Sequence, residues 1–460
     1  MRRVDDLLIG AGPAAAGVYA ALSEAPSASR RSLLILGGGA AQQAPLARSK
    51  YGFPDARGAI SEATFGLPAV RAFGSGGSTR LWHGGLFIPH ADDMLIDATG
   101  VPADLPALLH SAAASPAMRH LPLAPALPFM ANEVSNTDHG PWRTVLVPTH
   151  RPALITPLAI PLPPTHRFDD RAALDFKRSA SNGWQTRVVG PEGIETIESE
   201  RIILAAGCLA TLALVARFTG RNAIGFTDHL HVFAGVVSRR ALPSELRSRL
   251  GPQSSGLPNY SRRHIWKERI EAAGMDADVG LSFRAVANPE FPRSGRRYGR
   301  FLSSRGTGIA GKLALGIKHP VTAAEMLAYK FGVELSFDTY LVHATISPRS
   351  HAGRIIQGRA NFAPDVEGIA HIATEAFARF VRHFGIEGTV GARAFDTNSI
   401  AQSVISGAQF AGGPEAIGPM MDAVDGLHIA DTAAMRFTSV YNQCLLSMIV
   451  GYRSGQALAA

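Results

Sequence analysis

Apolar runs and glycine turns alternate at the start of the chain in a way that predicts a strand–helix–strand unit. Residues 4–9 form a short apolar run, and the glycine-rich stretch 10–17 follows directly. Residues 18–22 have helical character, and residues 33–36 form a second apolar run that ends in three glycines. A strand, a glycine turn, a helix and a second strand within about 40 residues are typical of a dinucleotide-binding β–α–β unit.

The pattern of the later chain predicts further strands and two long helices. Residues 102–164 are rich in proline and alanine, which favours extended connections over long helices. Residues 369–384 have the period of an amphipathic helix, with Ile372, Phe377, Phe380 and Val381 facing inward. The remaining expected elements are strands at 185–189, 194–198, 201–207, 339–346 and 427–431, a helix that begins near Cys208, and a final helix at 443–458.

Composition is that of a soluble globular protein. The chain has 460 residues, 46% of them hydrophobic and 18% charged, which suits two or three domains or one large discontinuous one. It shows neither a secretory signal nor an apolar run of about 18 residues, the length that a membrane-spanning helix needs. Two cysteines imply no disulfide framework, so we expect a cytoplasmic protein.

The net charge of +8 is concentrated in one region, where only Glu325 opposes the basic residues. That region is either a solvated face or a surface that meets anionic lipid, a phosphorylated carrier or an acidic glycan. No nucleic-acid-binding module accompanies it, so DNA and RNA are not expected partners. The basic residues are Arg293, Arg296, Arg297, Arg300, Arg305, Lys312, Lys318 and Lys330.

The first glycine turn is the strongest local signal for a ligand. Gly10 permits the tight turn, and Gly12 lets a pyrophosphate approach the N-terminus of the following helix. Ala15 takes the third position of the motif, where a small side chain allows close packing of helix and strand. The alternative is an ordinary strand–turn–helix unit that binds nothing.

Four further segments occur in the order found in one family. The chain resembles the glucose–methanol–choline (GMC) oxidoreductases through these segments together with the first glycine turn. The matching segments are the glycine-rich stretch 71–79, the strand and helix at 201–214, Asp228-His229, and the stretch 427–431 with Asn442 and the helix that reaches Arg453.

The resemblance implies an α/β fold with a discontinuous, Rossmann-like FAD-binding domain and an α+β substrate domain that contains an antiparallel sheet. The FAD-binding domain would comprise residues 1–100, 184–235 and 405–460. The substrate domain would comprise residues 236–404, with residues 101–183 as a substrate or cap segment.

FAD is the cofactor that the resemblance implies. Asp431 would approach its pyrophosphate or ribityl region, and Asn442 would hydrogen-bond to substrate oxygen beside flavin N5. Catalysis would move a hydride to the flavin while a base takes the hydroxyl proton. The implied cofactor-binding residues are Gly10, Gly12, Ala15, Gly38, Gly76, Gly77, Ser78 and Asp431.

Two positions depart from the family pattern. Gly37 stands where an acid normally binds the adenosine ribose, which removes a hydrogen bond worth about 1.5–3 kcal/mol. Gln409, or Ala408 in a shifted alignment, stands at the position of the first catalytic histidine, and neither residue can accept the proton. His83 is the first candidate for a replacement base, followed by His90, His229 and His231.

These features favour an oxidoreductase that oxidises a CH–OH group of a sugar, glycan intermediate or secondary metabolite. Because the usual histidine is missing, two alternatives stay open. One is a lyase, isomerase or cyclase that keeps the fold without redox turnover, and the other is a non-catalytic partner in membrane-linked glycan or lipid assembly. No spacing of His, Cys, Asp or Glu predicts a metal site, and no motif of a hydrolase or NTPase is visible.

Overall fold

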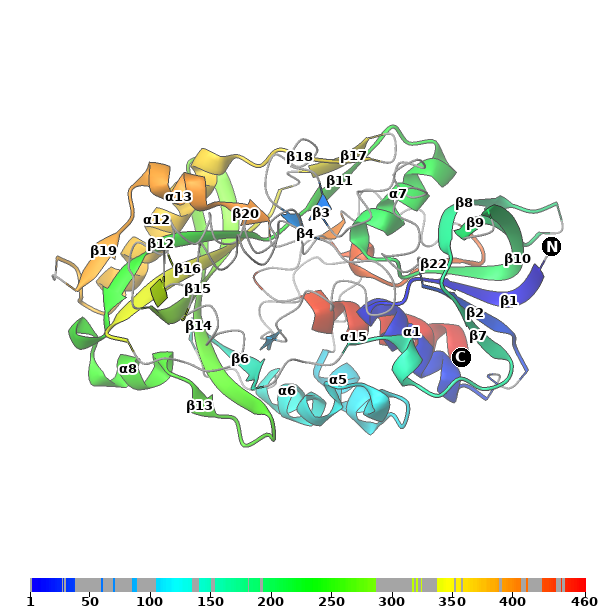
Figure 1. Ribbon diagram of the computed structural model, residues 1–460, viewed down its shortest axis with the longest axis horizontal. Coiled ribbons are helices and arrows are strands. Elements are labelled where there is room, and N and C mark those ends of the chain that lie inside the picture. The colour runs from blue at the N-terminus through cyan, green and yellow to red at the C-terminus, as the bar shows by residue number, and fades with distance from the viewer. Residues whose placement is uncertain are drawn as a thin grey trace.

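The fold is described from a computed structural model, shown in Figure 1. The residues that the structure describes are 2–26, 28, 30–37, 59–60, 69–70, 85–88, 105–134, 140–149, 154–180, 182–190, 193–286, 317, 320–321, 324, 337–350, 353–356, 359–388, 391–406, 411–412, 424–435, 440 and 443–460.

The first sheet combines a parallel core with an antiparallel extension. Its strand order is β7-β2-β1-β10-β9-β8, with β22 paired to the end of β10. The pairs β1–β10, β1–β2, β2–β7 and β10–β22 are parallel, whereas β8 and β9 run antiparallel. The strands are β1 (Arg2–Ile9), β2 (Leu33–Leu36), β7 (His166–Asp169), β8 (Ala172–Arg178), β9 (Trp184–Gly190), β10 (Gly193–Leu204) and β22 (Leu427–Ile429).

Helices α1 (Pro13–Glu24) and α15 (Gln443–Ala459) lie side by side against this sheet, and glycines let their backbones touch (Figure 1). A Cβ on Gly17 would lie 2.7 Å from Tyr452 N, and one on Gly455 would lie 2.6 Å from Val18 O. A Cβ on Gly451 would overlap the backbone of Ala14. The two ends of the chain are therefore held together at backbone contact distance.

A buried carboxylate ties three distant segments together. Asp6 on β1 accepts hydrogen bonds from the guanidinium groups of Arg31 and Arg201, and Arg201 also donates to the carbonyl of Leu458 on α15. Burial alone would raise the pKa of Asp6, but the hydrogen bonds from Arg201 and Arg31 outweigh it and lower the pKa. This cluster fixes β1, β10 and α15 relative to one another.

The second sheet is antiparallel and is covered on one face by helix α12 (Val366–His383). Its strand order is β19-β12-β16-β15-β14-β6-β5, with β13 beside β14 and β20 beside β12. Asp365 caps α12 by accepting a hydrogen bond from Gly368 N, and Phe380 packs against Trp266 and Phe283 of the sheet. The strands are β5 (Leu86–Phe87), β6 (Trp142–Pro148), β12 (Leu230–Ser238), β13 (Gln253–Ser254), β14 (Tyr260–Ala272), β15 (Met275–Val286), β16 (Thr339–Pro348), β19 (Ala392–Ala394) and β20 (Ile405–Ser406).

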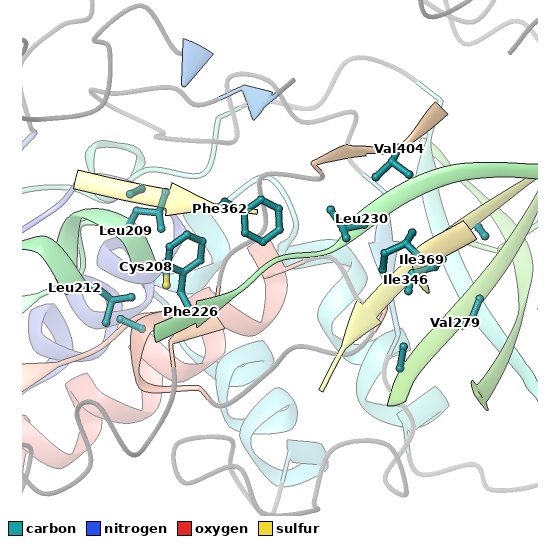
Figure 2. Packing of buried hydrophobic residues seen from close by; sticks show 14 of the residues in the cluster. Cys208, Leu209, Leu212, Phe226, Leu230, Val279, Ile346, Phe362, Ile369 and Val404 are labelled. Carbon is teal, nitrogen blue, oxygen red and sulfur yellow. The ribbon is translucent and has the colours of Figure 1, made fainter. Parts of the chain in front are cut away.

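A third, smaller sheet joins the two larger ones. It has the order β18-β17-β11-β21, and Phe226 of β11 stacks on Phe362 of β18. Figure 2 shows that this aromatic pair meets Cys208 and Leu209 of α7, and that the apolar packing continues to Leu230 at the start of β12. The elements are β11 (Ala223–Thr227), β17 (Gly353–Ile356), β18 (Arg359–Phe362), β21 (Ala411–Gly412) and α7 (Cys208–Thr219).

The remaining elements are short. The alanine-rich segment forms two short helices where extended chain was favoured, because Leu105, Leu109 and Leu127 find buried positions. These elements are α5 (Leu105–Ala114), η2 (Met118–His120), η3 (Ala124–Ala126), α6 (Leu127–Val134), η4 (Pro157–Ala159), η5 (Arg239–Ala241), α8 (Ser244–Leu250), α13 (Thr397–Ser403), η6 (Thr432–Ala434) and the pair β3 (Ala59–Ile60) and β4 (Ala69–Val70).

The predicted fold class is confirmed: a parallel sheet built from the first, middle and last segments accompanies an antiparallel sheet. The expected strands at 194–198 and 201–207 are one continuous strand, β10. The expected segment boundaries of the two domains stay a prediction. Strands β7 and β8 join the first sheet, whereas β5, β12 and β20 join the second.

We predict that Gly451→Ala destabilises the protein by about 3 kcal/mol, because its Cβ would force the two helix backbones apart. The midpoint of urea unfolding measures this loss. Gly251→Ala is the matched control, since a Cβ there meets nothing nearer than 3.9 Å and φ is −78°. We expect Gly251→Ala to change stability by less than about 1 kcal/mol. Equal midpoints for the two variants would contradict close helix contact.

Candidate functional site

Four parallel strands end in line at one edge of the first sheet. Ile9 at the end of β1 is the register partner of both Leu36 and Leu204, and Leu204 is the partner of Ile429. The carboxyl edge of a parallel sheet is where doubly wound folds bind their ligands. The residues that follow the strand ends therefore define the cofactor side of the candidate site.

The glycine turn after β1 has the geometry that its sequence predicts. Gly10 adopts a φ of +134°, which favours glycine, and a Cβ there would lie 2.9 Å from Ala206 N. Gly12 is the N-cap of α1, and Ala15 is fully buried in the first turn. Gly10 is thus required both by the turn and by the close approach of β10.

The N-terminus of α1 is suited to an anion. Pro13 has no N–H, and among the described residues the N–H groups of Ala14 and Ala15 have no hydrogen-bond acceptor. The first turn of α1 carries no acidic side chain. Free N–H groups and the helix dipole together favour a phosphate group at this position.

Asp431, which follows β22, holds neighbouring parts of the chain together through its carboxylate. Its fully buried carboxylate accepts hydrogen bonds from Gly207 N at 2.9 Å, Thr211 Oγ1 at 2.6 Å and Ala433 N at 2.8 Å. These bonds tie the end of β22 to the start of α7. The expected approach of Asp431 to the cofactor stays a prediction.

A different carboxylate lies at the end of β2. Strand β7 runs parallel beside β2, and Gly37 N donates a hydrogen bond to Asp169 O at 2.8 Å. A Cβ built on Gly37 would lie 2.8 Å from Oδ1 of Asp170 and 2.5 Å from Cζ of Phe168. The absence of a side chain at position 37 therefore makes room for two side chains of the neighbouring strand.

The second sheet carries a polar cluster on the face opposite α12, formed by His231, Ser282, His343 and Thr345. The rings of His231 and His343 stack with their centroids 4.9 Å apart. The Thr345 hydroxyl lies 3.2 Å from Nδ1 of His231, and the Ser282 hydroxyl lies 3.2 Å from Nδ1 of His343. We call these four residues the histidine cluster.

Burial keeps both imidazoles neutral. It lowers the pKa of His231 to about 4. Burial, with smaller contributions from the charges of His231 and Arg284, lowers the pKa of His343 to about 3. Among the described residues the hydroxyls engage Nδ1 in both rings, which leaves Nε2 of each ring for a substrate.

Two contacts connect the histidine cluster to segments that the sequence analysis singled out. Gly280 lies in the same cross-strand row as Thr345 and His231, and a Cβ there would lie 3.2 Å from Val440, two residues before Asn442. Ile405 of β20 is the register partner of His231, four residues before Gln409. The segment that leads to Asn442 therefore lies against this face, and the strand that leads to Gln409 lies beside His231 in the sheet.

Several predicted site residues lie outside the described residues: His83, Gln409, Asn442, Gly38, Gly76, Gly77 and Ser78. His90 does as well, whereas His229 is described and is 1% exposed. The basic stretch from Arg293 to Lys330 is described only at Ile317, Pro320, Val321 and Ala324, all of them exposed, so its contact with an anionic surface stays a prediction.

Sequence reasoning missed Asp170, Ser282 and His343. His343 and Thr345 alternate with Val342, Ala344 and Ile346 along β16, so a period of two could have placed the polar pair on one face. Nothing in the sequence could have paired Asp170 with Gly37, because that contact depends on the pairing of β7 with β2.

Within the described ranges, no three or more His, Cys, Asp and Glu side chains are grouped to hold a metal ion. None of the described helices is long and apolar enough to cross a membrane.

The solved structures to which this chain is similar include three flavoenzymes of the GMC family. Pyridoxine 4-oxidase from Mesorbium loti is 16% identical with a TM-score of 0.52, and the match covers 99% of each chain. A fungal aryl-alcohol oxidase is 11% identical with a TM-score of 0.54, covering 99% of this chain and 98% of the other. Formate oxidase from Aspergillus oryzae, as an R554K variant, is 12% identical with a TM-score of 0.51, and the match covers 100% of this chain and 98% of the other.

At these identities the likeness establishes the fold: the chain has the architecture of the GMC flavoenzymes over its whole length. The resemblance in sequence motifs points to the same family. No family model matches the sequence, and no curated protein matches it.

We predict that Asp431→Ala destabilises the protein by about 3 kcal/mol even without cofactor, because two buried donors and one half-buried donor lose their acceptor. Urea unfolding of the flavin-free protein measures the effect. Asp425→Ala is the control, since Asp425 is exposed in the turn before β22. If Asp431→Ala kept full stability and lost only flavin, the carboxylate would instead serve the cofactor directly.

The histidine cluster predicts an acid-sensitive fold. The ordinary pKa of histidine is 6.5 and both folded values are lower. Below about pH 6.5 the unfolded chain binds protons that the folded pair excludes, so stability falls as the pH drops from 6.5 towards 4. Between pH 7 and pH 5 we expect each histidine to contribute about 1–2 kcal/mol to this loss.

Urea midpoints at the two pH values test this expectation. The double variant His231→Gln, His343→Gln should lose less stability on acidification than the wild-type protein. A variant of the exposed His371 to Gln should keep the wild-type dependence. An unchanged dependence in the double variant would show that the two imidazoles are not excluded from protonation.

Proposed function

We propose that this protein is an FAD-dependent oxidoreductase that oxidises a CH–OH group of a small-molecule or glycan-like substrate. One observation carries the proposal: a glycine turn suited to an anion lies in line with three other strand ends, in a chain that has the GMC fold throughout. The similar solved structures include an aryl-alcohol oxidase and formate oxidase variants that concern FAD modification.

The described residues fit a dinucleotide. Gly10 forms the turn before α1, and Gly12 caps the helix without a side chain. Among the described residues no acceptor takes the N–H groups of Ala14 and Ala15, which could therefore bind a pyrophosphate. Gly38, Gly76, Gly77 and Ser78 are the further residues that the family resemblance places along FAD. When bound, FAD supplies a hydride acceptor.

The substrate side would be formed by the histidine cluster and by Asn442. Asn442 cannot act as a base, but its amide can hydrogen-bond to the substrate hydroxyl and orient it. The proton acceptor must be uncharged near neutral pH, and the lowered pKa values keep both half-buried imidazoles neutral there. We propose His231 as the base, because its register partner Ile405 lies four residues before Gln409, the position of the family's histidine.

Two measurements test the function. The purified protein should show a flavin absorption spectrum and release FAD on denaturation. Anaerobic addition of alcohol substrates should then bleach that spectrum, with electrons transferred to the flavin. A colourless protein that takes up no FAD would overturn the proposal. Bound FAD that no alcohol reduces would favour the lyase, isomerase or cyclase alternative.

We predict that Asn442→Ala leaves FAD bound and slows flavin reduction by about 10- to 100-fold, because one hydrogen bond that orients the alcohol is lost. Stopped-flow absorbance under anaerobic conditions measures the rate. His231→Gln should slow reduction by about 10²–10⁴-fold if it is the base. The same loss in His83→Gln, with His231→Gln unaffected, would transfer that role to His83.

A further inference from the structure

The end of strand β2 lacks a side chain that the family resemblance leads one to expect. An acid at this position would bind the adenosine ribose, and the chain has Gly37 instead. The neighbouring parallel strand β7 ends in register with β2, since Leu36 pairs with Asp169. Strand β7 ends in one acid, Asp169, and is followed by a second, Asp170, so β7 brings two carboxylates to the edge at which β2 ends.

The two acids face different surroundings. Asp169 forms ion pairs with Arg171 and, at 3.6 Å, with Arg2, so its carboxylate is committed to neighbouring arginines. Asp170 instead places Oδ1 2.8 Å from where a Cβ of residue 37 would stand. The carboxylate of Asp170 thus lies in the space that a side chain at the end of β2 would occupy.

We propose that Asp170 binds the ribose of an adenine dinucleotide, in place of the missing acid after β2. A carboxylate is an acceptor for the 2′- and 3′-hydroxyl groups, which both donate hydrogen bonds. The proposal rests on FAD being the cofactor, as argued above. It adds that the ribose contact comes from β7, a strand outside the first β–α–β unit.

Ligand binding tests the proposal directly. FAD and FMN are titrated into flavin-free protein, and quenching of flavin fluorescence gives each dissociation constant. We predict that Asp170→Asn weakens FAD binding by about 10- to 100-fold, because one charge-assisted hydrogen bond is lost. FMN has no adenosine half, so its affinity should change by less than about twofold. Asp169→Asn is the matched control and should leave the affinity for FAD as it is.

A second measurement gives a result on the wild-type protein alone, so it holds even if the variant misfolds. The wild-type protein should be stabilised against heat more by ADP than by 2′-deoxy-ADP at equal concentration, and Asp170→Asn should not distinguish the two nucleotides. Equal stabilisation of the wild-type protein by both nucleotides, or an unchanged affinity of Asp170→Asn for FAD, would overturn the role of Asp170 while FAD binding stood. A wild-type protein that bound neither FAD nor ADP would overturn the proposed function itself.

Discussion

The backbone contact between α1 and α15 is the constraint on which the rest of the structure depends. Gly17, Gly451 and Gly455 bring the two helices closer than side chains would allow. Because α15 comes at the end of the chain and α1 at its start, this contact closes a unit whose parts are separated by more than 400 residues in sequence. Arg201 strengthens the closure by joining Asp6 of β1 to the carbonyl of Leu458.

That closure determines where the candidate site lies. With α15 fixed, β22 pairs with β10 and its end falls in line with those of β1 and β2. Asp431 then holds this alignment through its bonds to Gly207 and Thr211. Val440, which precedes α15, packs against Gly280 of the second sheet and so connects the substrate side to the unit that α15 closes. The cofactor side and the histidine cluster therefore meet through the segment that leads into α15.

Local patterns predicted much of this fold. The strand at 33–36 and the inward face of α12 follow from short-range periodicity, and Gly10 follows from the glycine turn. The sequence could not predict that β7 extends the parallel sheet, because strand pairing is set by non-local packing. For the same reason it left Asp170 and His343 without a role. The sequence predicted that Asp431 approaches the cofactor. It could not show that three hydrogen-bond donors of the chain itself contact the Asp431 carboxylate.

The same physical explanation applies to both departures from the family pattern, Gly37 and Gln409: in our proposals a side chain on a neighbouring strand takes the role of the missing one. Adjacent strands lie about 4.8 Å apart, so a side chain on a neighbouring strand reaches nearly the same space as one on the strand that lost it. Asp170 lies beside Gly37 in this way, and His231 lies across from Ile405 on the way to Gln409. A ribose contact tolerates such a move well, since a carboxylate accepts hydrogen bonds from several directions. Proton transfer demands more, because the base must come within about 3 Å of the hydroxyl. The loss of the histidine is therefore the stricter test of whether this fold has kept its redox chemistry.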